Sequence, residues 1–377
     1  MNRRERLMAT LRGEPVDRPP VSFYELNGLD EDVSDPDPFN IYTDPSWKPL
    51  IELTTEKTDR IVMRKATFNG VLPDPAVSLT TSETFLKDGS LFTVRTVNIG
   101  SRKLHSRTRR DPDVNTVWTE EHLLKDVDDI KLFLEIPQQE FVGNPDFDGV
   151  LIAEKKLGDT GIVMIDTPDP LCMAASMFDM GTYTVIAMTE PELFGRLLEK
   201  YAAIILSATE KFSRALPGRL WRIYGPEYAA PPYLPPRLFR EYVVHYDKPM
   251  IDVIHRHGGF ARIHSHGRLK AILDDIVSTG AVALDPVEPP PQGDVELKYV
   301  REKYGQELVL FGNLEISDIE ILSQDSFAEK VRMAIEEGMK GAGRGFVLMP
   351  SACPYGRKLS QKALKNYEKM VDIIEAI

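Results

Sequence analysis

The sequence predicts an α/β protein built on a closed (β/α)₈ barrel, the architecture called a TIM barrel. From about residue 150 onward, short apolar segments alternate with longer segments whose apolar residues recur every three or four positions. Strand-then-helix units repeated in this way form parallel sheets. Eight strand candidates favour a closed barrel over an open sheet. No early strand leads into the G-x-G-x-x-G motif of a dinucleotide-binding sheet.

The eight strand candidates consist of an early pair and a later group of six. The early pair lies near Val21–Tyr24 and at Arg60–Met63. The later six are Ile162–Ile165, Leu220–Tyr224, Ala261–His264, Ala281–Leu284, Leu308–Phe311 and Gly345–Met349.

Helical periodicity characterises the segments between these strands. Residues 3–12 form the first predicted helix, which Gly13 ends. The motif Thr189-Glu190-Pro191-Glu192 is a capping box that predicts a helix running to about Ala215. Other predicted helices are residues 123–134, one opened by Pro235-Pro236, one containing Leu269, Ile272, Leu273 and Ile276, one containing Phe327, Val331 and Ile335, and residues 359–376.

Residues 66–119 have a different pattern, which predicts an antiparallel β insertion within a single barrel domain spanning residues 1–377. Threonine and valine dominate, polar and apolar residues alternate, and Lys87-Asp88-Gly89-Ser90 is typical of a hairpin turn. A basic run alternates every second residue, which is typical of the solvated face of a hairpin. Its members are Arg102, Lys103, His105, Arg107, Arg109 and Arg110.

Composition is typical of a soluble globular protein and argues against several other classes. No window of the sequence contains the roughly 18 apolar residues of a membrane span. The charged N-terminus leads into an amphipathic helix and lacks an apolar signal core, so a cytoplasmic location is expected. A net charge of −12 argues against a nucleic-acid partner. The two cysteines, Cys172 and Cys353, are too few for a disulfide framework.

The most informative motif is His264-Ser265-His266-Gly267 at the end of a predicted strand. Side chains two apart in an extended segment point the same way, so both imidazoles would leave the strand end together. In a TIM barrel this rim carries the chemistry. Two interpretations are open: the histidines act in catalysis or metal binding, or they cap the next helix and bond to backbone. The other five, His105, His122, His245, His255 and His257, are expected to be non-catalytic.

Further polar residues follow the other predicted strands and would meet the histidines at the same rim. Histidine, cysteine and carboxylate together form the ligand set of a zinc site. Cys353 could instead be a small buried residue, and Glu288 could instead hold loop amides. Pro289-Pro290-Pro291 is either a preset pocket wall or a spacer, and Asp294 is the expected cap of the next helix. The rim candidates are Asp166, Glu227, Tyr228, Glu288, Asn313 and Cys353.

Several segments of the chain resemble the uroporphyrinogen decarboxylase-like superfamily, whose members are (β/α)₈ barrels. The stretch from Arg4 to Pro20 is similar to the N-terminal signature of that superfamily. The segments His264-x-His266-Gly267, Phe311-Gly312-Asn313 and Gly345–Pro350 are similar to its later motifs. The resemblance covers most of the chain apart from residues 66–119.

The resemblance separates two branches of the superfamily. True decarboxylases carry an arginine-rich segment after the first strand, where this chain has Phe23-Tyr24-Glu25-Leu26-Asn27-Gly28. A polycarboxylate would meet Glu25 there, so uroporphyrinogen decarboxylation is not expected. The other branch contains the cobalamin-dependent methyltransferases, some of which bind zinc through His-x-Cys and a distant Cys.

The methyltransferase branch implies specific roles for the rim residues. His264 and Cys353 match the first and last zinc ligands, and His266 stands where a cysteine is expected. The resemblance therefore implies a zinc-dependent enzyme that moves a methyl group from a small donor, such as an O-methyl ether, to a corrinoid on a partner protein. Glu227 would be a fourth ligand or proton donor. Asp166, Tyr228, Glu288 and Asn313 would bind substrate.

Two other functions compete with this prediction. One is a metal-free lyase or decarboxylase acting on a small acid, with His264 or His266 as general acid. The other is a non-catalytic corrinoid carrier, which the absence of an Asp-x-His-x-x-Gly motif disfavours.

Overall fold

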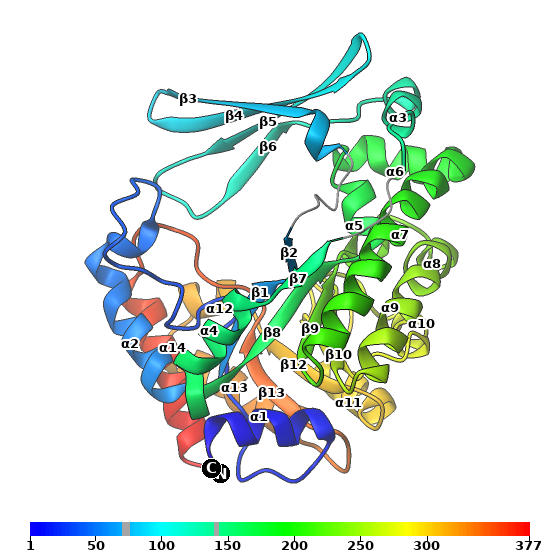
Figure 1. Ribbon diagram of the computed structural model, residues 1–377. Coiled ribbons are helices and arrows are strands. Elements are labelled where there is room, and N and C mark those ends of the chain that lie inside the picture. Colours follow the sequence, from blue (N-terminus) through cyan, green and yellow to red (C-terminus); the bar gives the residue numbers. More distant parts are fainter. Residues whose placement is uncertain (70–75, 139–142) are drawn as a thin grey trace.

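A curled parallel sheet forms the centre of the molecule in the computed structural model, which describes residues 1–69, 76–138 and 143–377 (Figure 1). Its seven strands follow one another in the order β1-β8-β9-β10-β11-β12-β13. The TIM-barrel-like arrangement agrees with the prediction from alternating strands and helices. The strands are β1 (Arg60–Lys65), β8 (Gly161–Pro168), β9 (Leu220–Tyr224), β10 (Phe260–His264), β11 (Ala283–Asp285), β12 (Val309–Leu314) and β13 (Phe346–Pro350).

Helices lie around the outside of this sheet (Figure 1). Strands of a parallel sheet are covered on both faces, which explains their near-continuous apolar sequences. The helices are α1 (Arg3–Arg12), α2 (Lys48–Lys57), α3 (Val127–Leu134), α4 (Asp148–Leu157), α5 (Pro170–Ala175), α6 (Met180–Thr189), α7 (Pro191–Ala215), α8 (Pro236–Phe239), α9 (His245–Arg256), α10 (Leu273–Ser278), α11 (Leu297–Tyr304), α12 (Ile316–Ile321), α13 (Gln324–Gly338) and α14 (Gln361–Glu375).

Shorter helical turns join several of these elements. A π-helical turn, η6 (Arg240–Val244), makes α8, η6 and α9 consecutive, so the helix predicted to open at Pro235-Pro236 is confirmed. The remaining turns are η1 (Ile41–Thr43), η2 (Pro45–Trp47), η3 (Val77–Leu79), η4 (Gly158–Thr160) and η5 (Pro226–Ala229).

The inside of the sheet holds an apolar cluster that the first helix closes at one end. Leu7 and Leu11 of α1 belong to the same buried cluster as Ile162 and Met164 of β8 and Phe311 of β12. The helix begins with a capping box in which Asn2 and Glu5 bond each other's backbone, and Gly13 ends it in a left-handed conformation. α1 therefore covers the amino-terminal end of the barrel and leaves the carboxyl end for the site.

The eighth predicted strand, Val21–Tyr24, is wrong as a strand, because the segment forms only isolated bridges, from Val21 to Leu348 of β13 and from Phe23 to the nearby Leu26. The Ser22 amide donates to the Leu348 carbonyl at 3.0 Å, and the Asp59 amide, just before β1, donates to the Val21 carbonyl at 2.7 Å. This short segment therefore bonds to both edges of the seven-stranded sheet.

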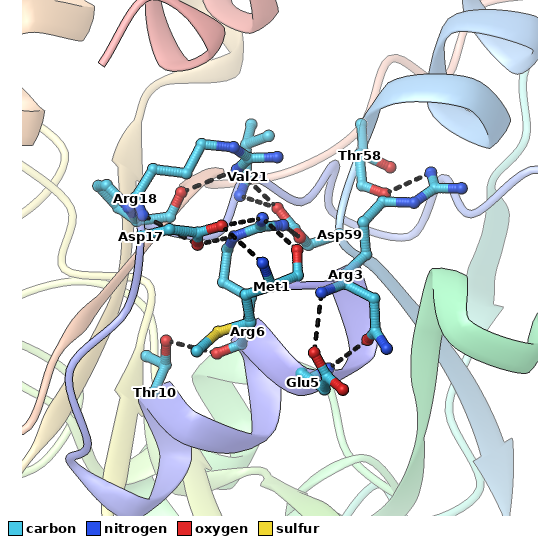
Figure 2. A network of polar contacts seen from close by, with 12 residues as sticks. Met1, Arg3, Glu5, Arg6, Thr10, Asp17, Arg18, Val21, Thr58 and Asp59 are labelled. Carbon is cyan, nitrogen blue, oxygen red and sulfur yellow. Dashed lines mark hydrogen bonds and ion pairs between the residues drawn. The ribbon is translucent and has the colours of Figure 1, made fainter.

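A buried carboxylate holds that closing segment in place (Figure 2). Asp59 has no exposed surface, and it accepts hydrogen bonds from Arg6 Nη1 at 2.6 Å, Arg18 Nη1 at 2.9 Å and the Val21 amide at 2.9 Å. Asp17 accepts hydrogen bonds from the other two side-chain nitrogens of Arg6, from Nε at 2.6 Å and from Nη2 at 2.8 Å. The N-terminal motif is thus a structural lock between α1, the closing segment and β1.

The predicted β insertion is present, as a four-stranded antiparallel sheet in the order β3-β4-β5-β6. The chain leaves β1 at its carboxyl end, so this sheet lies over the barrel mouth, at the top of Figure 1. Lys87 pairs with Ser90, and Asp88 and Gly89 both have positive φ, as predicted for the hairpin turn. The strands are β3 (Thr80–Lys87), β4 (Ser90–Ile99), β5 (Arg102–Arg110) and β6 (Val117–Glu121), with a separate pair β2 (Thr67–Asn69) and β7 (Asn144–Asp146).

Two predicted helix caps differ from the structure. Thr189 is the last residue of α6, where its hydroxyl donates to the Val185 carbonyl, and Glu190 instead stands at the N-cap of α7. Asp294 accepts a hydrogen bond from the Lys270 amide at 2.9 Å, and Glu296 stands at the start of α11 instead. In both places the side chain forms a different contact, within its own helix or with a distant segment.

Among the residues the structure describes, no helix combines the length and apolarity needed to cross a membrane.

Replacing Asp59 with alanine should destabilise the protein strongly, because Arg6 and Arg18 would remain buried with a partner removed. We expect a loss of about 3–5 kcal/mol in the free energy of unfolding. Denaturant unfolding measures it. Asp59→Asn, which keeps the shape, should lose less, and Glu14→Ala, at an exposed ion pair, should have no measurable effect. An unfolding curve of Asp59→Ala that equals that of the wild type would contradict a stabilising role of Asp59 between α1, the closing segment and β1.

Candidate functional site

His264 is the last residue of β10 and lies at the carboxyl end of the barrel among buried groups. Parallel pairing places it beside Tyr224 of β9 and Asp285 of β11. Its Nδ1 bonds to Asp285 Oδ2 at 2.9 Å, and its Nε2 lies 3.5 Å from the Tyr24 hydroxyl. The Asp285 contact fixes the ring and directs Nε2 toward the interior of the barrel.

His266 repeats this arrangement one step further out. Its Nδ1 bonds to Glu288 Oε1 at 2.8 Å, and the other oxygen of Glu288 accepts the Gly267 amide at 2.8 Å. Glu288 therefore does both things the sequence left open: it holds a loop amide and it orients a histidine. Burial lowers the pKa of His266, but the hydrogen bond and charge of Glu288 outweigh it, so this pKa is raised above its usual value.

The two imidazoles are neighbours, as the i, i+2 spacing predicted. Their ring centres are 4.7 Å apart and their planes are nearly perpendicular, at 88°. The side chain of His264 is 7% exposed and that of His266 is 38% exposed. His266 also lines a cavity of about 390 Å³ together with Glu227, Tyr228 and Arg268. The more exposed histidine is therefore the one that faces a space large enough for a small ligand.

A second set of buried charges lies beside His264. Arg222 of β9 donates to Asp166 Oδ1 at 2.6 Å and to the Tyr24 hydroxyl, and it lies 3.8 Å from Glu25. Burial raises the pKa of Tyr24 beyond its usual range despite the nearby Arg222 cation, so the phenol keeps its proton. Asp166, predicted to bind substrate, has Arg222 as its hydrogen-bond partner.

Arg262 of β10 completes this charged layer below the histidine. It is 1% exposed, and its Nε lies 2.9 Å from Asp285 Oδ1. Burial alone would raise the pKa of Asp285, but the charges of Arg262 and His264 outweigh burial and hold it at about 2. Asp285 is therefore a permanent carboxylate beside His264.

The sequence interpretation did not include five residues that the structure places at the site, which are Tyr24, Arg222, Arg262, Asp285 and Glu315. A detectable signal existed for the arginines: each occupies an inner position of a strand that is otherwise apolar. A charge within a doubly covered parallel strand needs a partner, and so indicates a buried polar network.

Glu315 follows β12 and lies close to Glu288 and His266. It is 6% exposed, and one of its oxygens accepts a hydrogen bond from the Ser351 hydroxyl at 3.3 Å. Burial, and next the negative charge of Glu288, raise the pKa of Glu315 to about 7. A carboxyl that exchanges its proton near neutral pH thus lies beside the histidine pair.

Glu227 links the cavity to two deeper carboxyls. Its Oε2 accepts a hydrogen bond from the Gly225 amide at 3.0 Å. Burial, and after it negative charge that includes that of Glu227, raises the pKa values of Asp169 and Asp247. Asp169 caps α5 and sits against Gly225, where an added Cβ would lie 2.1 Å from Asp169 Oδ1. Gly225 also has φ of 126°, so glycine is required at this turn.

Cys353 has a different environment from the histidines. Its Sγ donates to the Pro354 carbonyl at 3.3 Å, and burial, followed by the charges of Glu25 and Glu31, raises its pKa to about 12. Without a metal it is therefore a protonated thiol, and a bound zinc ion would have to displace that proton. Asn313, another predicted substrate residue, lies in β12 opposite Met349 of β13.

The fit to zinc is partial. Each histidine has the carboxylate partner at Nδ1 that metal-binding histidines show, but Nε2 of His264 is already in contact with the Tyr24 hydroxyl. A catalytic zinc takes three protein ligands. Within residues 1–69, 76–138 and 143–377, no three His, Cys, Asp or Glu residues are grouped so as to hold a metal ion. Glu227 and Cys353 are thus not brought together with the pair as a ligand set in this conformation.

The sequence profile of the family described as uroporphyrinogen decarboxylase (URO-D) matches residues 118–376, well over half of the chain. The chain belongs to the uroporphyrinogen decarboxylase family. The resemblance seen in its motifs is confirmed at this level. No curated protein matches the sequence.

A solved structure similar to this URO-D family member is a methyltransferase from Methanosarcina mazei, with a TM-score of 0.61 and 16% sequence identity. The match covers 100% of this chain and 99% of that one, so it includes the β insertion as well as the barrel. At this identity, the similarity shows a shared fold.

Glu315 should titrate near neutral pH and lower the stability of the folded state as pH rises. Its folded pKa is above the unfolded value, so the stability it contributes is present below the unfolded pKa and is lost as pH rises to about 7. Carbon-13 NMR of labelled glutamate should show a carboxyl with a midpoint near 7 that disappears in Glu315→Gln. The variant should gain stability over wild type between pH 5 and 8. A Glu315 midpoint near 4.5 would contradict this assignment.

Proposed function

We propose that this URO-D family member is a methyltransferase that takes a methyl group from a small methylated donor, such as an O-methyl ether, and passes it to a corrinoid on a partner protein. The observation that carries the proposal is the pair of carboxylate-held histidines at the barrel mouth. The whole-chain fold similarity to a methyltransferase from Methanosarcina mazei supports the reaction class.

The site supplies a proton where a demethylation needs one. When the carbon–oxygen bond of an ether breaks, the bonding electrons stay on oxygen, and the negative charge that develops there is neutralised by a proton. His266 faces the cavity, and Glu288 raises the pKa of its imidazolium, so it is placed to protonate that oxygen. The corrinoid, when bound, would supply the electron pair that forms the new bond to the methyl carbon. His264, buried between Tyr24 and Asp285, positions the outer ring.

Zinc remains part of the proposal only as an ion that the histidine pair would bind. His264 and His266 would offer Nε2, and Glu227 or Cys353 would have to move to complete the site. For this reason we derive no reaction step through a metal. The proton transfer from His266 stands without one.

The methyl-transfer reaction tests the proposal directly. The full chain is mixed with cob(I)alamin and a panel of methyl donors, including methanol and methoxybenzenes, and cobalamin absorbance is followed. His266→Ala should lower kcat/KM by about 100-fold or more, and Glu288→Gln by less. His245→Gln, an exposed histidine outside the site, is the matched control. Equal activity of His266→Ala and wild type on a donor that reacts would overturn the role of His266.

Metal content separates the zinc form of the proposal from the acid–base form. Elemental analysis is made on wild type and on His264→Ala/Cys353→Ala. About one zinc per chain that the double variant loses would support a rearranged ligand set. Wild type purified without chelators but lacking zinc would remove zinc from the proposal and leave proton donation by His266.

A second candidate, a metal-free lyase or decarboxylase, is favoured by the buried cations beside His264. Arg222 and Arg262 place positive charge near a histidine, an arrangement that suits a carboxylate substrate. Both cations are already paired, with Asp166 and Asp285, which weakens this candidate. Release of carbon dioxide from a small acid, without methyl transfer from any donor, would favour it.

A further inference from the structure

A second cavity, of about 550 Å³, lies between the inserted β sheet and the barrel helices. It is separate from the space at His266, because none of its lining residues is shared with that cavity. Its volume is within the range of small-molecule sites. Nothing in the methyl-transfer proposal uses it.

The roof of this cavity is the inner face of the antiparallel sheet and is polar. In β strands alternate side chains share a face, and Arg95, Ser106, Thr108 and Thr119 all line the cavity. The opposite face carries the stacked pair Phe85–Phe92 together with Arg107 and Arg109. Within the cavity lining, the sheet therefore presents hydroxyls, Val97 and the guanidinium of Arg95.

The floor of the cavity is mostly apolar, with His122 and Ser176 as its polar residues. It is formed by Leu123, Phe133 of α3, Met173 and Met177 near α5, and Tyr201 of α7. Phe133 and Tyr201 are 1% and 4% exposed, and their rings stack with centres 6.5 Å apart. Aromatic and methionine side chains of this kind favour a flat, apolar ligand body.

Arg95 differs from every other arginine of the sheet. Arg102 pairs with Glu135, Arg107 with Glu120, Arg109 with Asp111 and Glu120, and Arg110 with Asp37. Arg95 has no ion pair in the part of the chain that the structure describes, although the protein as a whole is acidic. An unpaired guanidinium at the side of a cavity is available to hold an anion.

We propose that this cavity binds a small organic anion with a flat apolar body, such as an aromatic carboxylate. Arg95 would hold the carboxylate with the roof hydroxyls, and Phe133, Tyr201 and the methionines would contact the ring. Met173 and Tyr201 also line a third cavity, of about 180 Å³, that reaches Asp166 and Tyr224 at the barrel rim. The ligand therefore lies next to the barrel mouth. The proposal is independent of methyl transfer.

Calorimetric titration of the full chain tests the site with a matched pair of probes, 2-naphthoate and the neutral 2-naphthalenemethanol. We expect 2-naphthoate to bind at one site per chain and the alcohol to bind about tenfold more weakly, because only the anion pairs with Arg95. Arg95→Gln should weaken 2-naphthoate about tenfold and leave the alcohol unchanged.

The control is Lys103→Gln, which removes an exposed cation from the opposite face of the same sheet. It should leave both affinities unchanged. If Arg95→Gln fails to fold by circular dichroism, Thr108→Val removes one roof hydroxyl and should weaken 2-naphthoate while the fold is kept. Equal binding of acid and alcohol, equal losses in Arg95→Gln and Lys103→Gln, or no binding of 2-naphthoate would each overturn the proposal.

Discussion

The buried carboxylate of Asp59 holds together the part of the barrel on which the site depends. The segment at Val21 is too short to be a strand, yet it bonds to β13 on one side and to the residue before β1 on the other. Asp59 fixes it through the Val21 amide and through Arg18. Three residues further on, Tyr24 reaches Arg222 and His264. Barrel closure and the innermost contact of the site therefore share one short segment.

The interior of the barrel is charged as well as apolar, and the charges are arranged in pairs. Arg222 with Asp166 and Arg262 with Asp285 lie one layer below the histidines. Burying such pairs costs more free energy than burying apolar side chains of similar size. The arrangement provides fixed geometry. Asp285 forms an ion pair with Arg262 and a hydrogen bond with His264, so the ring is held in one direction.

The sequence predicted the parts of this structure that depend on local pattern. Seven of the eight predicted strands, the hairpin turn at Asp88-Gly89 and the contact between His264 and His266 follow from periodicity and spacing alone. The caps assigned to Thr189 and Asp294 were wrong, because Thr189 bonds within its own helix and Asp294 accepts from the distant Lys270 amide. Arg222 and Asp285 were missed for a related reason: their importance comes from partners on neighbouring strands, which sequence order does not reveal.

The two histidines are chemically alike but unequal in position, and this difference assigns their roles. His264 has contacts on both nitrogens, with Asp285 and Tyr24, and almost no exposed surface. His266 has one nitrogen held by Glu288, and its ring lines a cavity. A ligand entering from the mouth meets His266 first, and reaches His264 only by displacing the Tyr24 hydroxyl. In the proposed reaction we therefore assign proton exchange with the substrate to His266, and we assign to His264 and its buried charges the positioning of that ring.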